Sequence, residues 1–73
     1  MRHHRERGKV KWFNIEKGYG FIQRHKGQDI FVHESDIKQR SVLALHTGQV
    51  VEFRVERADK GLKAVDVTAP WYA

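Results

Sequence analysis

Two short apolar runs joined by a polar turn with a glycine occupy residues 17–33, and they constrain the fold more than any other part of the chain. The first run reads Lys-Gly-Tyr-Gly-Phe-Ile from Lys17, and the second reads Ile-Phe-Val-His from Ile30. This pattern is typical of a β-hairpin. Because side chains on a strand point to alternate faces, each run should divide into an inward and an outward set.

The two faces of this hairpin differ in character. The aliphatic set suits a buried core and consists of Ile22, Ile30 and Val32. The opposite set, which we call the aromatic face, consists of Tyr19, Phe21, Phe31 and His33. Both sets cannot be interior in so small a domain, so we expect the aromatic face on the outside. Exposed rings with cations beside them offer stacking surfaces for unpaired bases and counter-charges for phosphates.

The same residues resemble a known family. Residues 17–22 resemble the first ribonucleoprotein motif and residues 30–33 the second. Together with Gly-Lys-Val-Lys-Trp-Phe-Asn at residues 8–14, they resemble the cold-shock domain in order and spacing. The RNA-recognition motif carries a similar first string, but its two motifs occur in the opposite order and far apart. The resemblance spans residues 8–68 and implies an all-β fold, the five-stranded antiparallel Greek-key barrel of the OB type.

Three further strands are expected outside the hairpin. They cover residues 9–14, 49–56 and 62–68. Alternation predicts a core face made of Val51, Phe53 and Val55 in the fourth strand and of Val65 and Val67 in the last one. Between the hairpin and the fourth strand we expect a short turn or helical loop at residues 34–37. Five short strands that must leave no open edge also favour a closed barrel.

Trp12 is the point where alternation and the resemblance disagree. Strict alternation would bury Trp12 beside Val10 and would put Phe13 outward with Lys11. The resemblance instead implies that Trp12 lies at the rim of the binding surface. We follow the resemblance and expect a bend or bulge in this strand.

Length and composition allow one domain of modest stability. We expect a flexible basic arm at residues 1–7, the domain at 8–69 and a short tail at 70–73. The arm is either a solvated terminus or a phosphate contact. The tail contains Trp71 and Tyr72, which either cover the barrel, extend the binding face or mediate self-association.

The net charge of +5 favours a polyanionic partner, and the aromatic face favours nucleic acid over an anionic membrane surface. No apolar run is long enough to cross a bilayer, and the first residues are not a signal peptide, so we predict a cytoplasmic protein. Cysteine is absent, and the paired His3 and His4 have no matching ligand spacing nearby. We therefore expect neither a metal nor a cofactor.

The resemblance implies the residues that contact nucleic acid. They are Lys11, Trp12, Phe13, Asn14, Lys17, Tyr19, Phe21, Asp29, Phe31, His33, Glu34 and Lys60. Asp29 either accepts hydrogen bonds from a base edge or only counters a nearby lysine. The chain departs from the family at Glu34 and Val42, where most bacterial members carry rings, so the extent of the stacking surface is open.

We predict a single-stranded nucleic-acid-binding protein of low sequence preference, for RNA or single-stranded DNA. It would act as an RNA chaperone and affect transcription termination or translation. Binding to open strands shifts folding equilibria by mass action, without ATP. We expect a monomer, with a hairpin-exchanged dimer as the other possibility.

Two other functions fit the sequence less well. A protein-interaction β-barrel would use the aromatic face to bind a peptide, but the cations around the rings argue against it. A nuclease assembled from Asp29, His33, Glu34 and Asp36 lacks a catalytic spacing, so we expect no enzymatic activity.

Overall fold

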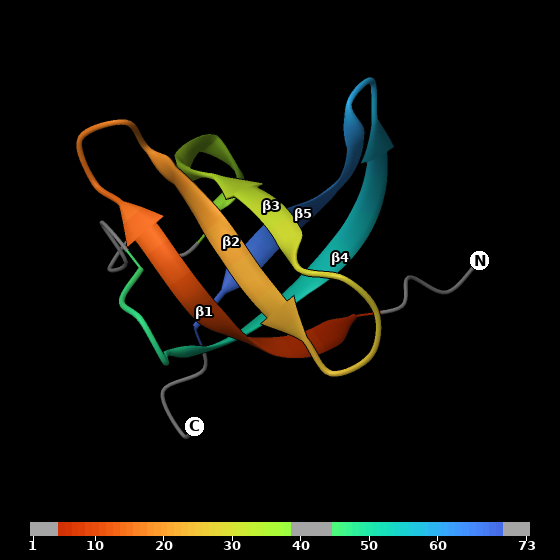
Figure 1. Cartoon of the computed structure of the whole chain (residues 1–73), viewed down its shortest axis with the longest axis horizontal. Coiled ribbons are helices and arrows are strands. Elements are labelled where there is room, and N and C mark those ends of the chain that lie inside the picture. The colour runs from red at the N-terminus through yellow and green to blue at the C-terminus, as the bar shows by residue number, and fades with distance from the viewer. Residues whose placement is uncertain (1–4, 39–44, 70–73) are drawn as a thin grey trace.

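Five strands and one short 3-10 helix make up the part of the chain that the structure, a computed structural model, describes: residues 5–38 and 45–69. The predicted all-β fold is confirmed (Figure 1). The elements are β1 (Glu6–Asn14), β2 (Tyr19–Arg24), β3 (Ile30–His33), η1 (Glu34–Asp36), β4 (Val50–Ala58) and β5 (Gly61–Thr68).

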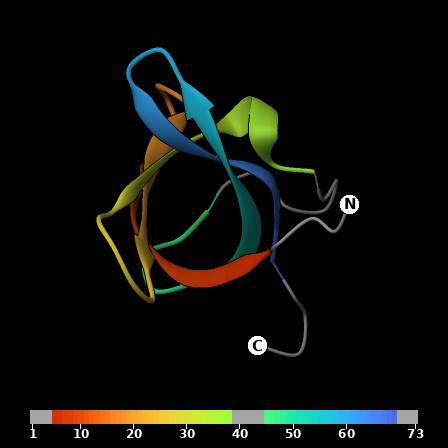
Figure 2. The same cartoon turned by 90° about the vertical axis from the view of Figure 1, so that its right-hand side faces the viewer.

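The strands close into a barrel in the order β1-β2-β3-β5-β4. Figure 2 looks into this ring of strands, with η1 and the β4–β5 turn at one end. β4 pairs with both β5 and β1, which closes the barrel. The predicted closed barrel is confirmed, with one difference in detail. β3 and β5 pair in parallel, because the chain passes through η1 and β4 before it returns beside β3.

The core is the aliphatic set that alternation predicted for the central strands. Ile22, Ile30 and Val32 are at most 2% exposed, and Val51 and Phe53 are fully buried. Leu45, from the segment that precedes β4, completes the same cluster. A buried set on one side of β2 and β3 leaves the alternate side chains outside, as the sequence predicted.

A bulge in β1 resolves the conflict over Trp12. Val10 pairs with Ile22 and Trp12 pairs with Phe21, so Lys11 has no partner opposite it on β2. The extra residue inverts the alternation beyond it. Trp12 is therefore outward and 40% exposed, as expected from the resemblance. The predicted outward orientation of Phe13 is wrong, because Phe13 packs partly against the core.

β5 also departs from strict alternation. Val65 and Val67 are buried as predicted, but Ala64 is buried too. The core cluster contains Ala64 and Val67 and leaves Val65 outside it. The register against β4 shifts at this point, and Asp66 has a φ of 51°. This local irregularity allows Ala64 and Val67, three positions apart, to face the core together.

The barrel begins earlier than the sequence suggested. β1 starts at Glu6 instead of residue 9, and its first residues pair with β4. Glu6 and Arg7 thus belong to the barrel and not to a terminal arm. The rest of the expected arm up to residue 4, Val42 and the tail at 70–73 lie outside the described residues.

Within the described part of the chain, no helix is long and apolar enough to cross a membrane.

Candidate nucleic-acid interface

Four aromatic rings contact one another on the outer surface of β1, β2 and β3. Trp12 lies 5.8 Å from Tyr19 and 5.4 Å from Phe21, measured between ring centroids. Phe31 lies 5.7 Å from Tyr19 and 5.9 Å from Phe21. Each ring thus contacts two others in a closed circuit, which we call the ring platform. The contacts are tilted or edge-on, the geometries that aromatic pairs prefer.

Strand register brings these rings together. Phe21 lies directly opposite Phe31, and Tyr19 opposite His33, so alternate residues of β2 and β3 share the outer face. Gly20 allows β1 to approach from the other side. A Cβ at Gly20 would clash with the carbonyl oxygen of Trp12 and would lie 2.7 Å from the Cα of Phe13. A glycine at this position is therefore required for the close β1–β2 contact beneath the platform.

Lys11 and Asp29, both predicted contacts, form an ion pair with each other at the edge of the platform. The Lys11 Nζ lies 2.7 Å from Asp29 Oδ2, and both side chains are exposed. Asp29 thus counters a nearby lysine, which is one of the two roles predicted for it, and its contact with a base edge stays a prediction. An exposed pair of this kind contributes only about 0–1 kcal/mol, so a phosphate is able to compete for Lys11.

Asn14 and Lys17 lie in the β1–β2 turn. Asn14 Oδ1 accepts a hydrogen bond from the backbone N–H of Lys17 at 2.9 Å, and the Asn14 carbonyl accepts from Gly18 at 2.8 Å. The Asn14 side-chain oxygen therefore stabilises the turn. The sequence predicted Asn14 only as a ligand contact and did not predict this structural role. The Lys17 ammonium makes no ion pair with any described residue and remains open to solvent.

His33 is held in one tautomer by the start of η1. Its Nδ1 accepts a hydrogen bond from the backbone N–H of Ser35 at 3.1 Å and lies 2.9 Å from Ser35 Oγ. Because a backbone N–H can only donate, Nδ1 is unprotonated and the neutral ring carries its proton on Nε2. His33 thus presents an N–H donor next to the rings, suited to an acceptor on a base or phosphate.

Glu34 lies against the β1–β2 turn at one end of the platform. Its backbone N–H donates to the Gly18 carbonyl at 2.8 Å. Its carboxyl carbon lies 2.7 Å from where a Cβ on Gly18 would be, and Gly18 has a φ of 74°. Glycine at this position is thus favoured by the positive φ, and a larger residue would also displace the Glu34 carboxylate. The exposed carboxylate gives this end of the platform a negative charge.

A cleft of about 630 Å³ continues the platform toward the β4–β5 turn. Phe21 and Phe31 of the platform line this cleft together with Lys60 and Leu62. The sequence identified Lys60, but it missed Leu62, which is 45% exposed beside the rings. Only the parallel pairing of β3 with β5 brings Leu62 to this cleft, and no local pattern signals that pairing.

Asp29, His33, Glu34 and Asp36 do not come together as a metal-binding group. Among the described residues, no three His, Asp or Glu side chains are gathered to hold a metal ion. Asp29 pairs with Lys11, and Asp36 lies 3.9 Å from the Nζ of Lys63.

Comparisons with known proteins agree with this geometry. The family model described as the "Cold-shock" DNA-binding domain matches residues 6–70. The chain is 51% identical over 61 residues to a cold shock-like protein of Thermotoga maritima, covering 84% of this chain and 92% of that protein. It is 50% identical over 62 residues to the cold shock protein CspC of Bacillus subtilis, covering 85% and 94% respectively.

A solved structure shows the same fold. The structure titled "drosophila Unr CSD456" superposes with a TM-score of 0.78 at 22% identity, covering 93% of this chain and 27% of that one. The family model and the relatives span nearly all of the barrel described above. This chain belongs to the cold-shock domain family.

Proposed function

We propose that the protein binds single-stranded RNA or DNA through the ring platform, with low sequence preference. The observation that carries this proposal is the closed circuit of four partly exposed rings, with centroids 5.4–5.9 Å apart, on the outer face of the barrel. Every base has a flat face that stacks on such rings, so stacking alone discriminates little between sequences. Membership of a family whose model is described as DNA-binding supports the same ligand class.

The surrounding side chains supply contacts to the strand. Lys17 is exposed in the β1–β2 turn next to Tyr19, Lys60 lines the cleft with Phe21 and Phe31, and both are suited to phosphates. Lys11 joins them when a phosphate displaces Asp29. His33 donates through Nε2 to a base edge or a phosphate. No chemical step is assigned to these groups.

We propose that this binding acts as an RNA chaperone activity. A protein that binds the open strand and not the duplex removes unpaired RNA from the folding equilibrium. Structured transcripts are thereby kept open, with consequences for transcription termination or translation. Duplexes bind poorly because their bases are already stacked and paired.

The test is a tryptophan fluorescence titration over a salt series. A Trp71→Phe variant makes Trp12 the one reporter, and Trp12 is itself part of the platform. Single strands should quench it in a saturable, salt-sensitive manner, while duplex of the same sequence competes weakly. An absence of quenching by any single strand overturns the proposal. Saturable quenching by peptides instead of oligonucleotides would favour the protein-interaction alternative.

A further inference from the structure

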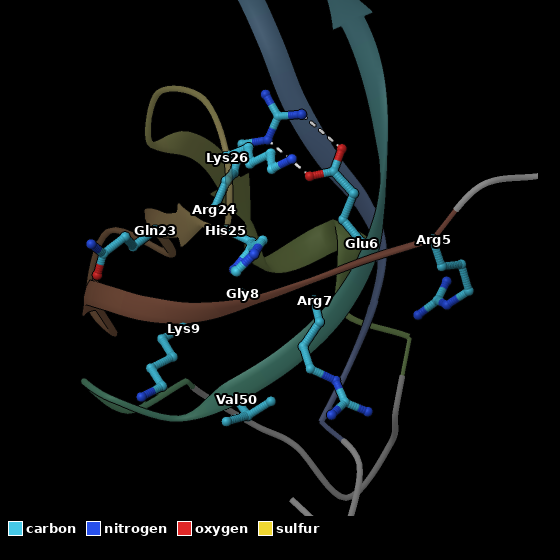
Figure 3. Close-up of a pocket in the computed structure, with 10 residues that line it drawn as sticks. All are labelled: Arg5, Glu6, Arg7, Gly8, Lys9, Gln23, Arg24, His25, Lys26 and Val50. Atoms are coloured by element: carbon cyan, nitrogen blue, oxygen red, sulfur yellow. Dashed lines mark hydrogen bonds and ion pairs between the residues drawn. The ribbon is translucent and has the colours of Figure 1, made fainter.

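A second, strongly basic surface lies beside the ring platform and takes no part in the stacking. It is an open groove of about 920 Å³ between the first half of β1, the end of β2 and the loop that follows β2 (Figure 3). We call it the basic groove. The Lys, Arg and Glu side chains that line it are those of Arg5, Glu6, Arg7, Lys9, Arg24 and Lys26.

Glu6 is the one carboxylate among the described residues that line the groove, and Arg24 neutralises its charge. Glu6 accepts two hydrogen bonds from Arg24, at 3.0 Å from Nε and 2.7 Å from Nη2. Of the ion pairs made by residues that line the groove, the Arg24–Glu6 pair is the least exposed. Hydrogen bonding to Glu6 raises the pKa of Arg24. Arg7 is paired with Glu52, so the positive excess of the groove comes from Arg5, Lys9 and Lys26.

Charge around the ring platform is balanced by comparison. Lys11 is paired with Asp29, and Lys63 lies near Asp36. The exposed Lys17 and Lys60 are each offset by an exposed carboxylate in the same region, Glu34 beside the β1–β2 turn and Asp59 in the cleft. The positive excess that attracts a polyanion thus lies mainly in the basic groove and not around the rings.

Two of the groove's cations, Lys9 and Lys26, are available for a ligand. Arg7 and Arg5 already have partners, because Arg7 lies 2.9 Å from Glu52 and Arg5 donates to Thr68 Oγ1 at 3.0 Å. Lys9 and Lys26 are exposed and form no ion pair with any described residue. Removing either lysine would leave no carboxylate unpaired, which makes them suitable for a test.

The groove continues the surface of the platform along the β1–β2 ladder. On β2, Gln23 is the next outward residue after Phe21, about 7 Å further along the strand. Lys9 lies directly opposite Gln23. Figure 3 shows Lys9 and Arg7 projecting from the same side of β1. A strand that leaves the rings over Phe21 therefore reaches Lys9 without crossing the barrel.

We propose that the basic groove binds the phosphates of the same single strand where it extends beyond the ring platform. This inference rests on the proposed function and adds a second contact region with a different chemistry. No Phe, Tyr or Trp is among the described residues that line the groove, so its contacts are to the backbone and independent of base identity. The protein then binds long strands more tightly than strands that fill only the platform.

The test measures affinity for oligothymidine strands of about 4 and about 12 nucleotides, lengths within the range that OB folds cover. The variant is Lys9→Gln/Lys26→Gln. Loss of two phosphate contacts should reduce the salt slope for the long strand by about 1.4 and its affinity about tenfold near physiological salt. Affinity for the short strand should stay within about twofold. Thermal unfolding of the variant confirms that it is folded.

The control is Lys38→Gln/Arg57→Gln, which removes the same charge from exposed positions outside the groove and the platform. Lys38 lies 3.8 Å from Asp66, but Asp66 keeps its ion pair with Arg54, so no carboxylate is left unpaired. An equal loss in this control, or an equal loss for both strand lengths in the Lys9/Lys26 variant, overturns the proposal, because net charge alone then explains the effect. Wild-type protein that binds both lengths equally also overturns it and leaves the proposed function intact. Failure to bind either strand would instead contradict the proposed function itself. Loss of binding to phosphatidylglycerol vesicles with unchanged long-strand affinity would assign the groove to a membrane surface and overturn the proposal.

Discussion

Lys11 and Asp29 form an ion pair of 2.7 Å at the rim of the ring platform, although both had been predicted to contact the ligand separately. A phosphate that binds Lys11 must compete with this carboxylate. The pair therefore sets the charge that the strand meets at this edge.

Asp29→Asn should strengthen binding to all single strands, because it frees Lys11 and removes a negative charge. Lys11→Ala should weaken binding to all sequences alike and lower the salt slope by about 0.7, the value for one phosphate contact on a single strand. The double variant Lys11→Ala/Asp29→Asn shows whether the loss of affinity in Lys11→Ala comes from the missing attraction of the lysine or from repulsion of the strand by the unpaired Asp29. If Asp29→Asn weakens binding only to strands that contain one particular base, Asp29 recognises that base, and its assignment as only the counter-charge of Lys11 is wrong.

Phe21→Ala and Phe31→Ala should each weaken single-strand binding by about 1–3 kcal/mol, the usual loss for a base stacked on a ring. Stability should change little, because both rings lie on the outer face of the barrel. Ile22→Val is the matched control on the buried face, where it should cost about 0.5–1.5 kcal/mol of stability and leave binding unchanged. A collapse of folding in the Phe variants with normal binding by the remaining folded protein would invert the two faces.

Glu34→Phe should strengthen binding to uniform pyrimidine strands by about 1–3 kcal/mol, because it adds a ring where the platform now ends in an anion. Glu34→Gln removes the charge without adding a ring. A gain from Gln alone assigns the penalty to repulsion, and a gain from Phe alone assigns it to missing stacking. Should both variants lose affinity for cytosine-containing strands only, Glu34 accepts from the cytosine amino group and is a base-reading residue.

Acid should destabilise the barrel partly through Asp66. Hydrogen bonds from Arg54 lower the pKa of this carboxyl, with a further contribution from Lys38 at 3.8 Å. A lowered folded-state pKa means that the stabilisation is fully present above the ordinary value of about 3.9 and is lost as pH falls through the folded value. Thermal unfolding between neutral and strongly acidic pH measures this loss.

Asp66→Asn is the control for that prediction. Asn tolerates the positive φ of position 66 better than most residues, so the substitution tests the charge and not the backbone. The variant should be less stable at neutral pH and should lose less stability on acidification than the wild type. An identical acid dependence in both proteins would exclude Asp66 as a contributor.

Local sequence pattern predicted the central sheet correctly. Alternation in β2, β3 and β4 assigned Ile22, Val32 and Phe53 to the core and Phe21 and Phe31 to the surface, since each assignment depends only on neighbours along one strand. The family resemblance added what alternation could not, the outward position of Trp12. The resemblance could not say which residue carries the bulge, and strict alternation therefore misplaced Phe13.

The sequence by itself determined the strands and the outward rings of the central hairpin, because period-two alternation and glycine turns act over a few residues, and the family resemblance supplied the barrel. The tertiary structure alone decided the bulge at Lys11, the Lys11–Asp29 pair, the parallel β3–β5 contact that brings Leu62 to the rings, and the gathering of cations in the basic groove. Each of these joins residues that are distant in sequence. Such contacts depend on how the strands close around the shared core, and no local pattern encodes that closure.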